Sequence, residues 1–111
     1  MQTNYLAEQT LLGLFEVDEN GSVLYSSIES NGSTHHEPDI NGRNFFTQVA
    51  PFSNASDFER RFELFTLSET QSHSFGFTCQ YGDGPVLIKV LMARLNKSPT
   101  SCSSLIHLRK A

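Results

Sequence analysis

The chain has 111 residues, enough for one domain, since a single core commonly spans about 100 to 150 residues. Eight Lys and Arg against twelve Asp and Glu give a net charge of −4, which argues against nucleic-acid binding because that affinity needs a basic surface. No apolar run approaches the roughly 20 residues that span a bilayer, and the first residues lack a secretion-signal pattern. We therefore expect a cytoplasmic domain with no membrane partner.

The first part of the chain predicts a β-hairpin. Residues 11–17 have the pattern of a short strand, residues 18–21 contain the Asp, Asn and Gly that favour a tight turn, and residues 22–26 return as a second strand. The polar stretch 29–42 keeps neither the strand nor the helix period, so loops with one short helical turn are expected there.

Two helical segments are predicted next. A short apolar turn at Phe45–Val49 ends before Pro51, because proline disfavours helical geometry in the residue that precedes it. A longer helix is predicted from Ser56, which has the spacing of a capping box with Glu59. Three aromatic rings recur along one face of this helix and must be buried against a sheet: Phe58, Phe62 and Phe65.

Three strands complete the chain. Residues 73–81 alternate between apolar and small polar side chains, and residues 82–85 supply a turn. Residues 86–95 predict a central strand, residues 96–104 a polar loop, and residues 105–109 a last strand. Short connections favour antiparallel pairing, so the expected class is α+β, with a five-stranded antiparallel sheet and the helices on one of its faces.

This order of elements resembles the PAS domain, and residues 41–51 make the resemblance specific. Their sequence, Asn-Gly-Arg-Asn-Phe-Phe-Thr-Gln-Val-Ala-Pro, is similar to the Gly-Lys-Asn-Phe-Phe-Lys-Asp-Val-Ala-Pro segment of the photoactive yellow proteins. The similarity extends over most of the chain from Leu11 to Lys110. It implies a single PAS domain over residues 1–111.

The resemblance fails at the residue on which light sensing depends. In the photoactive yellow proteins, Val-Ala-Pro is followed by the cysteine that carries a p-coumaroyl thioester, whereas here the corresponding residue is Phe52. A phenyl ring has no nucleophile. Cys79 is expected in a strand and Cys102 in a late loop, so neither can take this place. We therefore expect no covalent p-coumaroyl chromophore.

Other pocket residues of the family correspond to this chain less directly. A Tyr and a Glu four residues apart bind the phenolate in the family, and Tyr25 and Glu29 have this spacing if a one-residue gap lies in the hairpin turn. If the gap lies after the strand, Ser26 and Ser30 take these places, because a one-residue slip exchanges the faces of a strand. The family's Arg corresponds to His35 and a neighbouring Thr to Ser33. The list of ligand-pocket candidates is therefore Tyr25, Glu29, Ser33, His35 and Phe52.

A cofactor or metal has weaker support. His35, His36, Glu37 and Asp39 form a cluster of potential ligands, and imidazole can bind haem, but solvated loop residues are the simpler interpretation. We expect neither metal nor cofactor, with haem or an unidentified small ligand as the alternative. No phosphate-binding glycine loop, activated nucleophile or carboxylate pair is found, so we do not expect an enzyme.

The sequence therefore predicts a PAS-type sensory or signalling module that acts through a protein partner or as a homodimer. On the strand predicted at 86–95, alternate leucines would form an apolar strip on the outer face of the sheet, with burial under the N-terminal segment as the competing interpretation. These interaction candidates are Leu87, Leu91 and Leu95. The alternative function is a sensor that binds a small molecule or haem in the PAS pocket.

Overall fold

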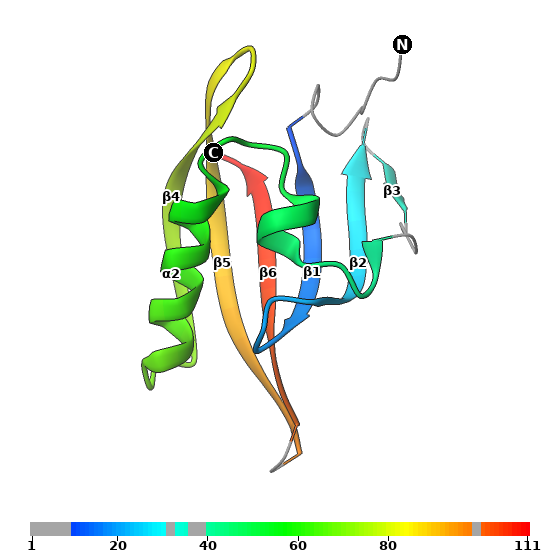
Figure 1. Ribbon diagram of the computed structural model, residues 1–111, viewed down its shortest axis with the longest axis vertical. Coiled ribbons are helices and arrows are strands. Elements are labelled where there is room, and N and C mark those ends of the chain that lie inside the picture. Colours follow the sequence, from blue (N-terminus) through cyan, green and yellow to red (C-terminus); the bar gives the residue numbers. More distant parts are fainter. Residues whose placement is uncertain (1–9, 31–32, 36–39, 99–100) are drawn as a thin grey trace.

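The structure is a computed structural model that describes residues 10–30, 33–35, 40–98 and 101–111. One antiparallel sheet contains all the strands in the spatial order β3-β2-β1-β6-β5-β4 (Figure 1). The helical segments lie together on one face of this sheet. The strands are β1 (Leu12–Asp18), β2 (Val23–Ser30), β3 (Ser33–His35), β4 (Ser72–Tyr81), β5 (Gly84–Ser98) and β6 (Ser101–Lys110).

The predicted α+β arrangement is confirmed, with one strand more than expected. The five predicted strands all form, and the additional one is β3, which pairs with β2 through three residues. It lies in the polar stretch for which we predicted loops and a helical turn. A strand of three residues leaves no hydrophobic period in the sequence, which explains why the pattern gave no sign of it.

The first hairpin forms around a side chain that fixes its turn. The Asp18 carboxylate accepts hydrogen bonds of 2.9 Å from the backbone N–H groups of Asn20 and Ser22. Gly21 has a φ of 89°, a conformation that suits glycine. A Cβ at this position would also lie 3.0 Å from the ring of Phe46, so the turn packs closely against the helical layer.

The helical layer consists of a π-helical turn, η2 (Phe45–Val49), and the helix α2 (Ala55–Leu67). Asn44 begins η2, where its side-chain oxygen accepts hydrogen bonds from the backbone of Phe46 and Thr47. The predicted face of α2 is confirmed, since its three aromatic rings are all buried: Phe58, Phe62 and Phe65.

The predicted start of this helix was wrong. The helix begins at Ala55, so Ser56 lies inside its first turn and does not cap it. Asn54 precedes the helix, and its side chain bonds to β4 instead, donating to the Thr78 carbonyl at 2.9 Å and accepting from the Gln80 N–H at 2.9 Å. These two bonds fix the start of α2 to the edge of the sheet.

The β5–β6 hairpin is longer than predicted, which corrects our expectation of a loop at residues 96–104. Asn96 pairs with Cys102 and Ser98 pairs with Ser101, so the two strands continue together beyond the body of the sheet (Figure 1). Residues 96–104 are almost all polar, so the sequence shows no hydrophobic alternation there, although the strands continue to pair. No described helix is long and apolar enough to cross a membrane.

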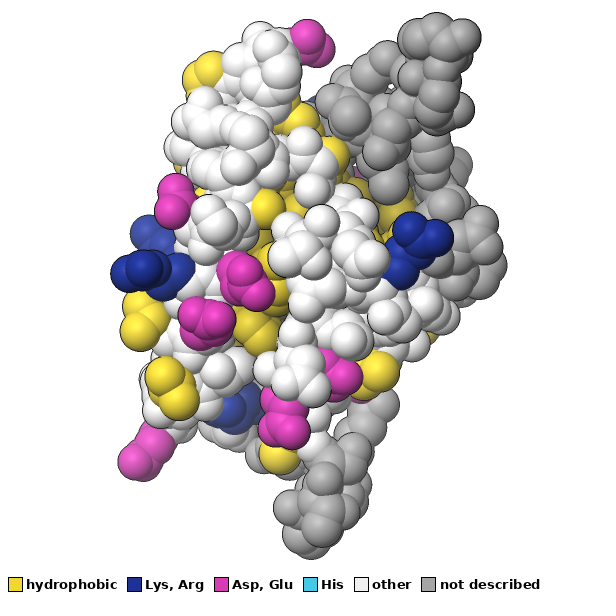
Figure 2. All heavy atoms as spheres, in the orientation of Figure 1, with side chains coloured by type: hydrophobic (Ala, Val, Ile, Leu, Met, Phe, Trp, Pro, Cys, Tyr) yellow, Lys and Arg dark blue, Asp and Glu magenta, His cyan; other side chains and the backbone are white. Residues whose placement is uncertain are grey.

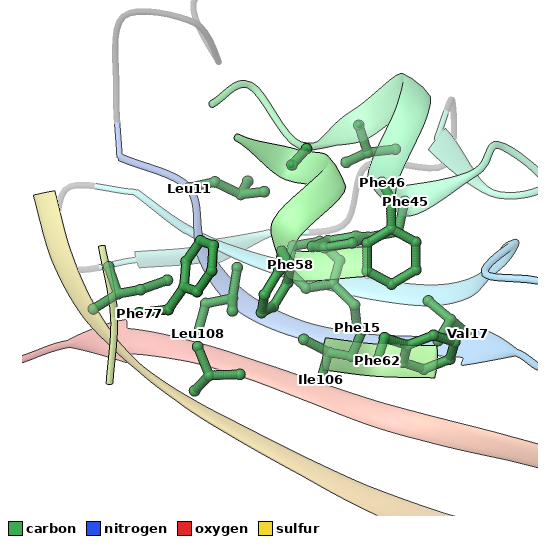
Figure 3. Close-up of a cluster of buried hydrophobic side chains, with 14 of the residues drawn as sticks. Leu11, Phe15, Val17, Phe45, Phe46, Phe58, Phe62, Phe77, Ile106 and Leu108 are labelled. Carbon is green, nitrogen blue, oxygen red and sulfur yellow. The ribbon is translucent and has the colours of Figure 1, made fainter. Parts of the chain in front are cut away.

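The hydrophobic core lies between the helical layer and the sheet. Figure 3 shows the ring of Phe58 pointing from α2 toward the strands, among side chains of the sheet that include Phe15 and Phe77. Phe15, Phe45 and Phe58 are completely buried. On the opposite side of the helical layer, Figure 2 shows charged side chains of both signs alongside exposed hydrophobic ones. In the described part of the chain, the core between these two layers is therefore packed with aromatic and aliphatic side chains.

Candidate functional site

Phe52 lies inside the core. It follows Pro51 in the segment between η2 and α2, and only 3% of its surface is exposed. Its ring centroid lies 5.9 Å from that of Phe58, 6.1 Å from that of Phe77 and 5.9 Å from that of Tyr81. These are the separations at which aromatic rings attract one another edge to face. Phe52 therefore joins the helical layer to the strand β4.

The same aromatic packing continues through the rest of the interior. The ring centroids of Phe58 and Phe77 are 5.1 Å apart, and those of Phe15 and Phe45 are 4.9 Å apart. The four cavities that we describe are lined by other residues, and none of them is lined by Phe15, Phe45 or Phe52. In the described part of the chain, aromatic rings therefore pack against one another on all sides of Phe58.

The interior contains no buried ionised side chain among the described residues. The buried polar residues there are three serines, Ser26, Ser103 and Ser104. Burial raises the pKa of the Cys79 thiol to about 12. Burial also raises the pKa of Tyr81 to about 12, although a hydrogen bond from the Leu11 N–H acts in the opposite direction. Both groups are neutral near pH 7, so neither provides an activated nucleophile or base.

Tyr25 and Glu29 do not face this interior, so the register that we preferred for β2 was wrong. Tyr25 is 42% exposed and Glu29 is also exposed, whereas Ser26 is 3% exposed. The reason is a β-bulge: Glu16 pairs with Tyr25 but Val17 pairs with Val23, so β2 has one extra residue at this point. The extra residue exchanges the two faces of the strand beyond it.

The remaining pocket candidates lie in β3 at the edge of the sheet. Ser33 pairs with Ser30 and His35 pairs with Ile28. The structure describes the backbone of these residues, and no described contact joins them to Phe52. The other members of the potential ligand cluster, His36, Glu37 and Asp39, lie outside the described residues. Of the candidates whose side chains the structure describes, Phe52 lies in the core and Tyr25 and Glu29 lie outside it.

The three interaction candidates lie together on the outer face of β5, opposite the helices. We call Leu87, Leu91 and Leu95 the outer β5 row. Leu87 is 56% exposed, and Leu91 and Leu95 are half-buried. The intervening residues Ile88 and Val90 are buried in the core, as expected for a strand with one face in the core.

A surface cavity adjoins the outer β5 row. Its volume is about 570 Å³, and its lining includes Leu87 and Leu91 together with Ser74 and Gly76 of the neighbouring strand. The cavity arises because Ser74 and Gly76 have little or no side chain to cover the sheet at this point. Two cations also line it, Lys89 and Arg109, which are directly opposite each other on β5 and β6. The outer face thus combines an apolar surface with positive charge.

Sequence reasoning missed two residues that position the helix against this sheet. We assigned no role to Arg94 from the sequence, yet its guanidinium donates hydrogen bonds to carbonyls at the end of α2. Asn54 was not singled out, although it binds the start of α2 to β4. Asn54 lies one residue before the helix but does not cap it, and its partners on β4 are distant in the sequence, so no local pattern could have found this role.

Comparison with known proteins identifies the fold. No protein-family model matches the chain. It is 29% identical over 87 residues to a photoactive yellow protein of Halochromatium salexigens, covering 78% of this chain and 70% of that protein. It is also 29% identical over 83 residues to a photoactive yellow protein of Rhodothalassium salexigens, and this match covers 74% of this chain and 66% of that protein.

A solved structure supports the same conclusion over almost the whole chain. The photoactive yellow protein domain of the sensor histidine kinase Ppr from Rhodospirillum centenum superposes with a TM-score of 0.58 and 25% sequence identity. The match covers 96% of this chain and 99% of that domain. The chain therefore has the PAS fold and is similar in sequence and structure to the photoactive yellow proteins.

Proposed function

We propose that this chain is a PAS-type sensory or signalling module that acts through protein–protein contact or dimerisation, without a covalently bound p-coumaroyl chromophore and without catalysis of its own. The observation that carries this proposal is the position of Phe52. The resemblance to photoactive yellow proteins aligns Phe52 with the cysteine that holds their chromophore, and its ring is packed against Phe58, Phe77 and Tyr81.

The packing around Phe52 favours contact over ligand binding. A pigment or haem would need the space that the aromatic rings occupy, and packed interiors yield such space only at a cost in stability. The neutral Cys79 and Tyr81 offer no charge to hold a phenolate. A small-molecule sensor remains the alternative function, and it requires the interior to open around its ligand.

The outer β5 row supplies the surface for contact. Leu87 is 56% exposed and lies in a row with the half-buried Leu91 and Leu95. Contact of this apolar surface with water is unfavourable, and a partner that covered it would gain free energy. The cations Lys89 and Arg109 beside this row would favour a partner with an acidic rim. The occurrence of a similar domain in a sensor histidine kinase is consistent with a module that passes a signal to a neighbouring protein or domain.

The test is the effect of a charge placed in the outer β5 row. Light scattering over a range of concentrations should show that Leu87→Lys weakens binding of a purified partner protein, because desolvation of the ammonium group in an apolar contact is costly. The control is Leu24→Lys, since Leu24 is 48% exposed on β2, away from this row. Equal association of the two variants and the native chain would argue against the outer β5 row as the contact.

A further inference from the structure

The outer edge of β4 carries backbone groups that no described residue pairs. Tyr81 and Gly84 are partners across a two-residue turn, so odd-numbered residues of β4 direct their N–H and C=O groups toward β5 and even-numbered ones direct them away. The bonds from Asn54 to Thr78 and Gln80 agree with this parity. Within the described chain, the outward groups of Ser72, Ser74 and Gly76 have no such partner.

This edge lacks the features that normally protect a strand from pairing with another chain. Natural sheets protect their edges with short strands, charged side chains, proline or bulges. The opposite edge is β3, which has three residues. By contrast, β4 has ten residues, contains no Lys, Arg, Asp, Glu or Pro, and pairs with β5 without a register shift. Ser72, Ser74 and Gly76 are all exposed.

We propose that β4 pairs with β4 of a second copy of this chain, antiparallel and about a two-fold axis at Ser74. In this register Ser74 of one copy faces Ser74 of the other, and Ser72 faces Gly76 in both directions. Each of these facing pairs exchanges two hydrogen bonds, as in any hydrogen-bonded pair of an antiparallel sheet. All the outward groups of the three residues are then paired, and the two sheets become one. This contact is separate from the outer β5 row.

The side chains along the edge suit a second copy of the same chain. His73 and Phe75 face the helical side, where their rings stack at 5.2 Å, and Arg61 lies 4.5 Å above the ring of Phe75. The two-fold register places His73 of each copy opposite Phe75 of the other, at the closer spacing of pairs without mutual hydrogen bonds. On the outer face, the small side chains at Ser72 and Ser74 leave the approach unobstructed.

An exposed leucine beside the edge adds apolar surface to the contact. Leu64 of α2 is 63% exposed and, together with His73, lines a surface cavity of about 300 Å³. Figure 1 shows α2 running alongside β4, so a second copy paired with β4 brings its own α2 to the same side. The two-fold arrangement therefore places the exposed Leu64 side chains of both copies on the same face of the joined sheet. An unrelated extended peptide would pair with the backbone but would bring no second helix to this face.

A proline at the centre of the edge tests the proposal. Ser74→Pro removes the outward N–H at the two-fold axis, and it leaves the β4–β5 hydrogen bonds intact because the backbone groups of Ser74 do not point toward β5. Sedimentation equilibrium should show a dimer for the native chain and a dissociation constant raised about tenfold or more for Ser74→Pro. Ser74→Ala keeps the backbone groups and should dimerise like the native chain.

Two further results decide between this edge and other contacts. Leu87→Lys should leave the edge dimer intact. If Leu87→Lys instead lost the dimer and Ser74→Pro kept it, the edge pairing would be overturned and the dimer would be assigned to the outer β5 row. Hydrogen exchange of the native chain needs no variant. The amide protons of Ser74 and Gly76 should exchange more slowly as the protein concentration rises. Exchange rates that do not depend on protein concentration would contradict the proposal. A native chain that stays monomeric at millimolar concentration would also contradict it.

Discussion

The phenolic oxygen of Tyr81 accepts a 2.8 Å hydrogen bond from the backbone N–H of Leu11. Tyr81 ends β4 at one edge of the sheet, whereas Leu11 immediately precedes β1 near the middle. The bond therefore spans the core at the end where Phe52 packs on the tyrosine ring. It places a titratable hydroxyl in a half-buried position.

The raised pKa values of Cys79 and Tyr81 predict a loss of stability at alkaline pH. The folded pKa of each is about 12, against ordinary values of 9.0 and 10.0. Above about pH 9 the unfolded chain begins to release protons that the folded chain retains, so the free energy of unfolding should fall as the pH rises toward about 12. Urea unfolding across this range measures the slope, and Cys79→Ala should make it shallower. An equal slope in the variant would contradict a buried neutral thiol.

Gly13 in β1 should tolerate no side chain. Its φ is 148°, and a Cβ would lie 2.4 Å from the carbonyl oxygen of Ser27 on the neighbouring strand. Gly13→Ala should therefore lower the free energy of unfolding by about 3 kcal/mol or more, from backbone strain and overlap together. The matched control is Gly76→Ala, where the nearest atom to a Cβ is a Leu87 methyl group at 3.6 Å. This control should be neutral or stabilise by up to about 1 kcal/mol. Similar losses in both variants would show that the crowding at Gly13 is not the cause.

Arg94 should stabilise the end of α2. Its Nη2 donates to the carbonyl of Phe65 at 2.7 Å and to that of Ser68, its Nε donates to Thr70 at 2.9 Å, and the guanidinium lies 4.9 Å from the Phe65 ring centroid. Carbonyls at a helix C-terminus lack partners within the helix, and a cation there also interacts favourably with the helix dipole. Arg94→Ala should lower the free energy of unfolding by about 2 kcal/mol.

The matched variant Arg94→Lys should recover only part of this loss, because a single ammonium cannot reproduce the planar fork of donors. Thermal unfolding followed by circular dichroism compares the two. If Arg94→Lys were as stable as the native chain, charge alone would explain the effect and the separate hydrogen bonds would contribute little.

Asn54 and Ser56 should differ in their effect on stability, contrary to the capping box that the sequence predicted. Asn54→Ala removes two hydrogen bonds to β4 and should cost about 1 to 2 kcal/mol. Ser56→Ala changes an exposed residue inside the first turn and should alter the free energy of unfolding by less than about 0.5 kcal/mol. Chemical denaturation measures the free energy of unfolding of both variants. A larger loss in Ser56→Ala than in Asn54→Ala would support the capping box instead.

The comparison of these two residues shows what sequence patterns can predict in this fold. The face of α2 was predictable because Phe58, Phe62 and Phe65 repeat with the helical period and need burial. The exact start of the helix was not, because Asn54 finds its partners on β4, which is distant in the sequence. The same limit explains Arg94, whose acceptors lie 24 to 29 residues away.

The candidate site was predictable in part for a similar reason. A buried role for Phe52 follows from its neighbours in the sequence, and the outer position of Leu87 follows from strand alternation. The orientation of Tyr25 was not predictable, because it depends on a bulge that inserts one residue into β2 opposite β1. A bulge does not change the number of hydrophobic residues in a strand, so the sequence did not show which face of β2 carries Tyr25.

The most direct test of a contact module without a tethered pigment is native mass spectrometry of freshly purified protein, with an absorbance spectrum of the same sample. We predict a subunit mass equal to the 12.4 kDa chain, with no bound small molecule and no absorbance band beyond that of the aromatic residues, and a dimer or partner complex under gentle conditions. A yellow sample whose mass is increased by a thioester-linked p-coumaroyl group would contradict the account.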